Sequence, residues 1–401
     1  MNNFFIVFGS SSFLILRFLT SLLLARYFGA ELFGVYVFLL TLSEVISRLF
    51  DFSLFHAGIF ESRISNTKVS FSFYVILFNS IIFFPLILLL LTGISFLSFE
   101  NNLNNILYEN ILFISFYISI KQISNAGIAL RGIDNSLKLF SLMQFCNSLF
   151  PLAIISTLIY LESISINNIF QFLLFSEILF LLLFISKFLG NFSFDSQKII
   201  NLYKFGLKAH LGVFGKILIH NIDKIIISIF LPAQIVGFYS IAKSFTMLSI
   251  FLFNMFLIKF RNKLLKFSQD LKFLRRVTYK ELVKNLILIF PIGIIFYFFS
   301  EQFITLLYGK EYIFSSNILR VIIWSNIFIF LPSIIWNYFY VLNKPNLVSL
   351  STLIPGIIGS VSLYIFIKYL GVQGLYLGYY FSIILTFITT FLWFVLSRKK
   401  V

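Results

Sequence analysis

Residues 4–28 read FFIVFGSSSFLILRFLTSLLLARYF, an almost unbroken apolar stretch with two basic residues, Arg17 near its centre and Arg26 close to its end. About 20 apolar residues let a helix cross the hydrocarbon core of a bilayer, so this stretch is long enough to span it. It is too long for the apolar core of a signal peptide, and no small-residue cleavage site follows it. We therefore expect a retained first transmembrane helix.

The composition of the whole chain supports the same class of protein. Charged residues make up 11% of the 401 residues and hydrophobic residues 59%, whereas charged residues are roughly 25% of an ordinary soluble domain. A soluble protein is therefore excluded. The single cysteine, Cys146, excludes an intramolecular disulfide and a thiolate metal cluster.

Twelve apolar windows along the chain are long enough to cross a membrane. They lie at residues 4–28, 32–56, 71–97, 106–130, 137–161, 169–189, 205–231, 235–259, 284–308, 317–341, 347–369 and 372–396. We therefore expect an all-α polytopic membrane protein of about 12 transmembrane helices. The longest connections, near residues 190–204 and 260–283, are expected to be loops.

The distribution of basic residues between the loops predicts the orientation, because cytoplasmic loops carry an excess of Lys and Arg. With the N-terminus in the cytoplasm, only Arg26, Lys310 and Lys368 fall in outward loops. The cytoplasmic side then receives twenty basic residues: Arg63, Lys68, Arg131, Lys138, Lys187, Lys198, Lys204, Lys259, Arg261, Lys263, Lys266, Lys272, Arg275, Arg276, Lys280, Lys284, Lys344, Arg398, Lys399 and Lys400. This bias predicts that both termini are cytoplasmic, and it explains most of the net charge of +16 without nucleic acid as a partner.

A repeat divides the chain into two halves. Residues 27–36, YFGAELFGVY, resemble residues 230–239, FLPAQIVGFY, at an offset of 203 residues. The first stretch links the first two predicted spans and the second links spans seven and eight. Six spans per half give both halves the same orientation, as in parallel-repeat transporters. We expect two pseudo-symmetric six-helix lobes, residues 1–195 and 196–401.

Basic side chains within the apolar windows predict a cationic cleft. A Lys or Arg at the centre of a membrane helix costs about 2.5–3.5 kcal/mol, so such residues normally face a polar interior and mark a substrate path. The candidates are Arg17, Arg48, Lys121, Lys208, Lys216, Lys224, Lys243 and Arg320. Arg17, Lys121 and Lys216 rank first because they are central, whereas Arg48 and Arg320 rank last.

Acidic residues and a histidine in the same windows are candidates for ion coupling. They are Glu44, Asp51, His220 and Asp223. His220 and Asp223 lie one turn apart beside Lys216, and imidazole titrates near neutral pH. Structural interpretations remain open, because Glu44 and Arg48 at i, i+4 could form a buried ion pair and Lys208 and Lys224 could reach opposite interfaces.

Motifs for catalysis are not found in the sequence. It has no Walker phosphate loop, dinucleotide fingerprint, zinc-protease motif or nucleophile elbow. The three histidines, His56, His210 and His220, show no metal-ligand spacing. We expect no cofactor or metal, and no ATP hydrolysis by this chain alone.

Several short motifs resemble the polysaccharide-biosynthesis flippases, the O-antigen (Wzx-type) exporters of the multidrug/oligosaccharidyl-lipid/polysaccharide (MOP) superfamily. These motifs are LARYFGAELFGVY at 24–36, DFSL at 51–54, NIDK at 221–224, VGFYSIA at 236–242, LYGKEY at 307–312 and YLGVQG at 369–374. Their order and spacing cover nearly the whole chain. Ser53 and Pro232 depart from the pattern, since each replaces a usual glycine.

The resemblance implies a MATE-like fold and a function. The expected activity is translocation of an undecaprenyl-pyrophosphate-linked oligosaccharide from the cytoplasmic to the periplasmic leaflet of the bacterial inner membrane, by alternating access. A cationic cleft would compensate the pyrophosphate charge while the lipid tail stays in the bilayer. A polymerase and a chain-length regulator of the same pathway are possible partners, and the sugar and the coupling ion stay open.

Two other functions remain as alternatives. A multidrug antiporter of the same superfamily that exports cations would be expected to line its cavity with acids, whereas basic residues outnumber acids here. An O-antigen polymerase or ligase would act on the same lipid-linked sugar, but we expect such an enzyme to carry a sizeable periplasmic loop. The predicted outward loops are too short to hold one.

Overall fold

The computed structural model describes residues 2–58, 69–96, 101–131, 137–188, 195–266, 270–342 and 344–397. The chain forms two compact units, Met1–His210 and Leu211–Val401. The division falls inside helix α7 (Ser196–His220), whereas the boundary expected from the repeat, 195/196, lies at the start of this helix. The first part of α7 belongs to one unit and its last part to the other.

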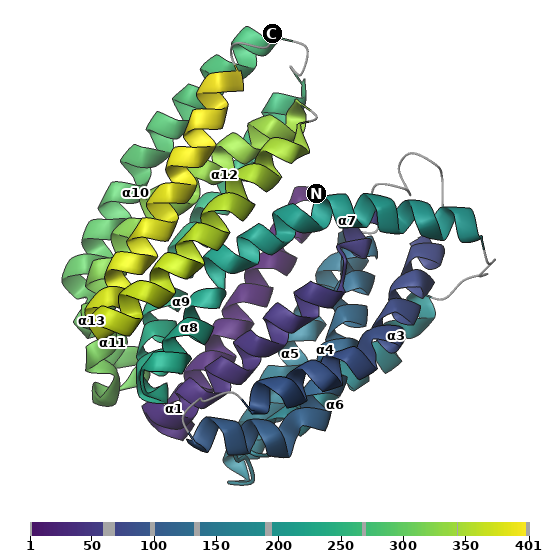
Figure 1. The fold of residues 1–401 in the computed structure, drawn as a ribbon, viewed down its shortest axis with the longest axis vertical. Helices are drawn as coiled ribbons and strands as arrows, with labels where there is room; N and C mark the ends of the chain where they lie inside the picture. The colour runs from purple at the N-terminus through teal and green to yellow at the C-terminus, as the bar shows by residue number, and fades with distance from the viewer. Residues whose placement is uncertain are drawn as a thin grey trace. The chain divides into compact units, whose positions relative to one another are not determined.

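Unit 1 is a helical bundle in which α1 packs against α5, and α4 packs against both α3 and α6. Its core gathers buried side chains from several helices, among them Phe73, Leu130, Met143 and Phe180. Besides the first part of α7, its helices are α1 (Asn2–Phe50), α3 (Val69–Ser95), α4 (Asn101–Arg131), α5 (Leu137–Tyr160), α6 (Ile169–Phe184) and the 3₁₀ turn η1 (Ile185–Lys187) (Figure 1).

Unit 2 is also a helical bundle, in which α12 packs against α9, α10 and α13, and α8 packs against α13. Its core contains Leu264, Ile334, Phe339 and Phe394, all of them fully buried. The elements are α8 (Ile222–Phe230), α9 (Ala233–Lys266), α10 (Leu271–Tyr308), η2 (Lys310–Tyr312), α11 (Ile313–Ile322), η3 (Ile323–Ser325), α12 (Asn326–Val341) and α13 (Pro345–Leu396) (Figure 1).

The expected all-helical, multi-pass membrane fold is confirmed. In the described parts of the chain, eight helical segments are long and apolar enough to cross a membrane. Two of these, α1 and α13, are 49 and 52 residues long and contain non-helical backbone at Gly29 and Gly371. Each is long enough for two crossings of about 20 residues. Predicted spans seven and eight, on α7–α8 and α9, are not among the eight segments.

The two halves of the sequence repeat break their helices by different means. Gly29 has φ 73° and ψ 176°, a conformation open almost only to glycine. The matching position is Pro232, which follows Leu231 in extended conformation and cannot continue a helix. The matched pair Ala30 and Ala233 is buried, as are the pairs Gly34–Gly237 and Tyr36–Tyr239. The repeated residues therefore occupy similar environments in their own units.

The two long loops expected from the sequence are mostly helical. α7 begins at Ser196, α9 continues to Lys266 and α10 already begins at Leu271. Polar, basic sequence was interpreted as loop, but Lys, Arg and Glu are good helix formers. Aspartates cap two of these helices: the side chain of Asp270 accepts from the Phe273 amide at 2.9 Å, and Asp195 accepts from the Lys198 amide at 3.1 Å. This amide and the Lys198 ammonium lower the pKa of Asp195 below its usual range.

Candidate substrate site

A buried polar cluster in unit 1 joins Lys121 of α4, Asn147 of α5 and Glu177 of α6. The Lys121 ammonium forms an ion pair with Glu177 and donates to Asn147 Oδ1 at 3.3 Å. Asn147 Nδ2 donates to Glu177 Oε2 at 3.1 Å. Glu177 and Asn147 are almost fully buried, and the Lys121 side chain is 12% exposed. Lys121 is therefore neutralised inside its own unit.

Glu177 was not predicted as a site residue. It is the lone charge in an otherwise uncharged apolar helix, IFQFLLFSEILFLLLF. A carboxylate at such a position is expensive unless a basic group compensates it. This isolation was the available signal that a partner existed, but the partner lies 56 residues earlier in the chain.

Arg17 and Glu44 lie on the two halves of α1, on opposite sides of the break at Gly29. Both interact electrostatically with the buried Tyr36 and with Lys121. Both side chains are exposed, and the Arg17 guanidinium lies 4.3 Å from the centre of the Phe13 ring. Together with Lys121 and Glu177 they form a group of two bases and two acids. The charges of these four residues therefore balance.

A second buried cluster, in unit 2, joins Asp223 of α8 to Lys243 and Tyr239 of α9. Lys243 forms an ion pair with Asp223, and the Tyr239 hydroxyl donates to the same carboxylate at 2.5 Å. Lys243 also donates to the backbone carbonyl of His220 at 2.6 Å. His220 is the last residue of α7, and the carbonyls of the last helical turn have no partner within the helix. The ammonium also lies 5.7 Å from the Tyr379 ring. These contacts satisfy Lys243 within the protein.

Lys216 has a different environment. It lies on α7, and its ammonium is 5.0 Å from the Trp336 ring and 5.9 Å from the Tyr340 ring, both on α12. Aromatic faces attract a cation but leave its charge uncompensated. Lys224 is half-buried and lies close enough to Lys243 to repel it. Among the described residues of α7, α8 and α9 in unit 2, the three bases Lys216, Lys224 and Lys243 therefore outnumber the one acid, Asp223, so positive charge is in excess.

The remaining predicted bases lie in more accessible places. The Lys208 side chain is exposed on α7. Arg320 donates to Ser300 Oγ at 2.9 Å and to Glu301 at 3.3 Å, and both charged side chains are well exposed. Arg48 pairs with Asp51 at 3.1 Å and lies 5.8 Å from the Phe55 ring. Among the described ion pairs, the partner of Arg48 is therefore Asp51 and not Glu44.

Asp51 belongs to a polar network at the end of α1. Its Oδ1 accepts from the Ser53 amide at 2.7 Å and lies 3.7 Å from His210 Nδ1 on α7. Side-chain amides from two other helices reach the last carbonyls of α1: Gln122 donates to Ser47 at 2.7 Å, and Asn79 to Phe50 at 2.8 Å. These bonds satisfy carbonyls that a helix end leaves without partners. The sequence pattern had not indicated His210, Gln122 or Asn79.

Metal-binding groups are not found in the part of the chain that the structure describes. There, no three His, Cys, Asp or Glu side chains come together closely enough to hold a metal ion. The charged clusters consist of ion pairs, amides and aromatic rings.

Comparisons with known proteins place the chain in a family. The profile of the family described as polysaccharide biosynthesis protein matches residues 23–317, well over half of the chain. The chain belongs to the polysaccharide biosynthesis protein family. A search of curated proteins found no match.

Solved structures share the fold of this polysaccharide biosynthesis protein. An inward-facing multidrug resistance MATE family transporter of the MOP superfamily matches with a TM-score of 0.80 at 14% identity, over 97% of this chain and 96% of that one. Lipid II flippase MurJ, in an inward closed conformation, matches with a TM-score of 0.73 at 16% identity, over 97% of this chain and 86% of that one. A mutant of the Vibrio cholerae MATE transporter VcmN matches with a TM-score of 0.69 at 11% identity, over 100% of this chain and 96% of that one.

These matches confirm the family resemblance found in the sequence. The polysaccharide biosynthesis protein has the helical fold of MOP-superfamily transporters. At these low identities, the likeness to solved structures shows the fold alone.

Proposed function

We propose that this protein is a flippase that moves an undecaprenyl-pyrophosphate-linked oligosaccharide, an O-antigen or other surface polysaccharide repeat unit, across the bacterial inner membrane. The observation that carries the proposal is the polysaccharide-biosynthesis profile over residues 23–317 on a fold shared with membrane exporters. One structural neighbour is described as a lipid II flippase. Alternating access of two lobes around a central site is the mechanism that such repeats support.

The expected topology completes the proposal. Twelve spans in two pseudo-symmetric lobes, divided near residue 195, would put both termini on the same side, and the basic residues of the loops predict that this side is the cytoplasm. The breaks at Gly29 and Gly371 give α1 and α13 two possible crossings each, so the eight apolar segments of the described ranges provide ten crossings, and α7–α8 and α9 would supply the other two. A polymerase and a chain-length regulator would act on the delivered repeat unit.

We assign the pyrophosphate contact first to Lys216 and Lys224. The charges of Lys121 and Lys243 are compensated by Glu177 and Asp223, whereas Lys216 contacts only aromatic faces among the interactions described. Arg17, Lys208, Arg48 and Arg320 remain candidates for guiding the anionic headgroup. Glu44, Asp51, His220 and Asp223 remain the candidates for coupling to an ion gradient.

Replacement of Lys216 tests the proposal. We expect Lys216→Ala to reduce surface polysaccharide by about 10- to 150-fold at unchanged protein level, since a hydrogen bond to a charged group contributes about 1.5–3 kcal/mol. Lys216→Arg keeps the cation and should keep part of the activity. Lys368→Ala is the matched control, because this exposed lysine also lies beside an aromatic ring, 5.7 Å from that of Tyr369. Normal polysaccharide in cells with Lys216→Ala would refute the role of Lys216.

A multidrug antiporter is the second candidate, because a MATE transporter gives the TM-score of 0.80. The balanced charges around Arg17 and Glu44 would repel a cationic substrate less than the positive excess in unit 2. Purified protein in vesicles distinguishes the two functions. The flippase transfers lipid-linked oligosaccharide between leaflets and ignores cationic dyes, whereas an antiporter exports the dye and leaves the lipid-linked sugar in place.

A further inference from the structure

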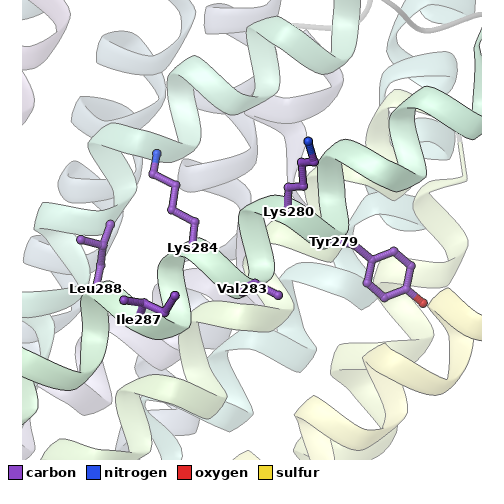
Figure 2. Close-up of a pocket in the computed structure, with 6 residues that line it drawn as sticks. All are labelled: Tyr279, Lys280, Val283, Lys284, Ile287 and Leu288. Carbon is purple, nitrogen blue, oxygen red and sulfur yellow. The ribbon is translucent and has the colours of Figure 1, made fainter.

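The N-terminal part of α10 carries a surface whose chemistry changes along the helix. A hollow of about 540 Å³ is lined by Tyr279, Lys280, Val283, Lys284, Ile287 and Leu288. Figure 2 shows the Lys280 and Lys284 side chains extending to the same side of α10, with Leu288 one turn beyond Lys284. Val283 and Ile287 are 59% and 65% exposed. The packing of unit 2 therefore leaves these side chains largely uncovered.

The spacing of the basic residues explains why they form one row. Lys272, Arg276, Lys280 and Lys284 recur every four residues, and all four side chains are exposed. Residues four apart lie on one face of a helix. Tyr279, Val283 and Ile287 have the same spacing and form a neighbouring apolar row. The two rows run side by side along α10.

The basic row stops where the uncharged part of the helix begins. Leu288 continues the row after Lys284, and residues 285–300 contain no charged side chain. At 1.5 Å per residue, this uncharged segment is about 24 Å long, more than the ~15 Å of hydrocarbon in one leaflet. Along this surface a cationic end is followed by exposed apolar side chains. This order matches that of a phospholipid, in which an anionic phosphate is followed by acyl chains.

The local charge favours an anionic headgroup over a zwitterionic one. Four exposed bases line the row, and the carboxylate of Glu281 lies 3.7 Å from the Lys284 ammonium. Glu281 also accepts a hydrogen bond from Asn285 at 3.2 Å, on the inner side of the helix. The Lys284 side chain remains 56% exposed. Glu281, which is partly buried, and Asp270, which caps the start of α10, therefore offset only part of the positive charge of the four bases.

We propose that this surface of α10 binds one anionic glycerophospholipid. Lys280 and Lys284 contact its phosphate, and Val283, Ile287 and Leu288 contact its acyl chains. The site is distinct from the central charged clusters and independent of the transported substrate. Basic residues beside a membrane span favour anionic lipids in this way.

Native mass spectrometry of the full-length protein in detergent tests the proposal. Phosphatidylglycerol should bind, whereas phosphatidylcholine with the same acyl chains and free glycerol phosphate should bind at least tenfold more weakly. Lys280→Gln with Lys284→Gln should weaken phosphatidylglycerol binding about 30-fold, or about fivefold per lysine. Glu281→Gln should strengthen it. Lys368→Gln on α13, also an exposed lysine, should leave it unchanged.

Other outcomes would overturn the proposal. Equal binding of phosphatidylcholine would show a nonspecific apolar surface, and undecaprenyl phosphate binding more tightly than phosphatidylglycerol would make this a substrate surface instead. Unchanged binding by the double glutamine variant would exclude the two lysines. If that variant does not fold, Lys280→Arg with Lys284→Arg decides, because it keeps the charge and must retain binding.

Discussion

At the scale of single residues, Lys121 shows how the structure changes the interpretation of a charge. Its position in the middle of an apolar window made it a leading substrate-binding candidate. The structure pairs it with Glu177, a residue with less than 2% exposure. Removal of one member of a buried pair leaves an uncompensated charge, so loss of Lys121 damages stability as well as any contact with substrate.

We expect Lys121→Ala to lower the free energy of unfolding by about 3–5 kcal/mol, because Glu177 would stay buried without its cation. Replacement of both residues, as Lys121→Met with Glu177→Leu, should recover most of this loss. Thermal unfolding in detergent measures both effects. If the double variant is folded and still transports, Lys121 is structural. If it is folded but inactive, the pair contributes to transport.

At the scale of helices, the glycine breaks decide how two of the longest helices in the described ranges are divided. Gly371 has φ 57° and ψ −130°, and a Cβ atom placed there would meet nothing within 4 Å. Position 371 therefore requires glycine because of its backbone conformation and not because of tight packing. Close helix contact explains other glycines: a Cβ atom on Gly215 of α7 would lie 2.5 Å from the Leu353 amide nitrogen of α13.

Gly371→Ala should destabilise the protein by about 1–3 kcal/mol, the cost of a side chain in a sparsely populated backbone region. Gly93→Ala is the matched control, because Gly93 also has no atom near its Cβ position but lies in regular helix α3. That change should be neutral or stabilising by up to about 1 kcal/mol. Melting temperatures in detergent compare the two. Similar values for both variants would show that Gly371 does not hold the break.

At the scale of the whole molecule, the fold is shared with MATE family transporters, and the orientation in the membrane is the next property to establish. Basic residues predict that the α9–α10 connection lies in the cytoplasm. A periplasmic reporter fused at Lys266 should therefore be silent, and one fused at Lys368 should be active. The reverse pattern would overturn the orientation, and activity at both sites would show that the span count is wrong.

The sequence by itself determined the class of the protein. Apolar windows such as residues 4–28 and the low charge content can be satisfied only by helices in a bilayer, where backbone groups must bond within the chain. The motifs at residues 24–36 and 236–242 also pointed correctly to the polysaccharide-biosynthesis family. Both kinds of signal are local, since they depend on residues that are close in sequence.

Only the tertiary structure decided which charges have partners. Lys121 and Glu177 are 56 residues apart in sequence, and Lys216 and the Trp336 ring that it contacts are 120 residues apart. The apolar pattern of a helix does not specify which neighbouring helix it faces, because hydrophobic helices in a bilayer associate through packing and polar contacts rather than through burial from water. The cost of a charge in a membrane is a property of the sequence, whereas its compensation depends on packing between distant helices.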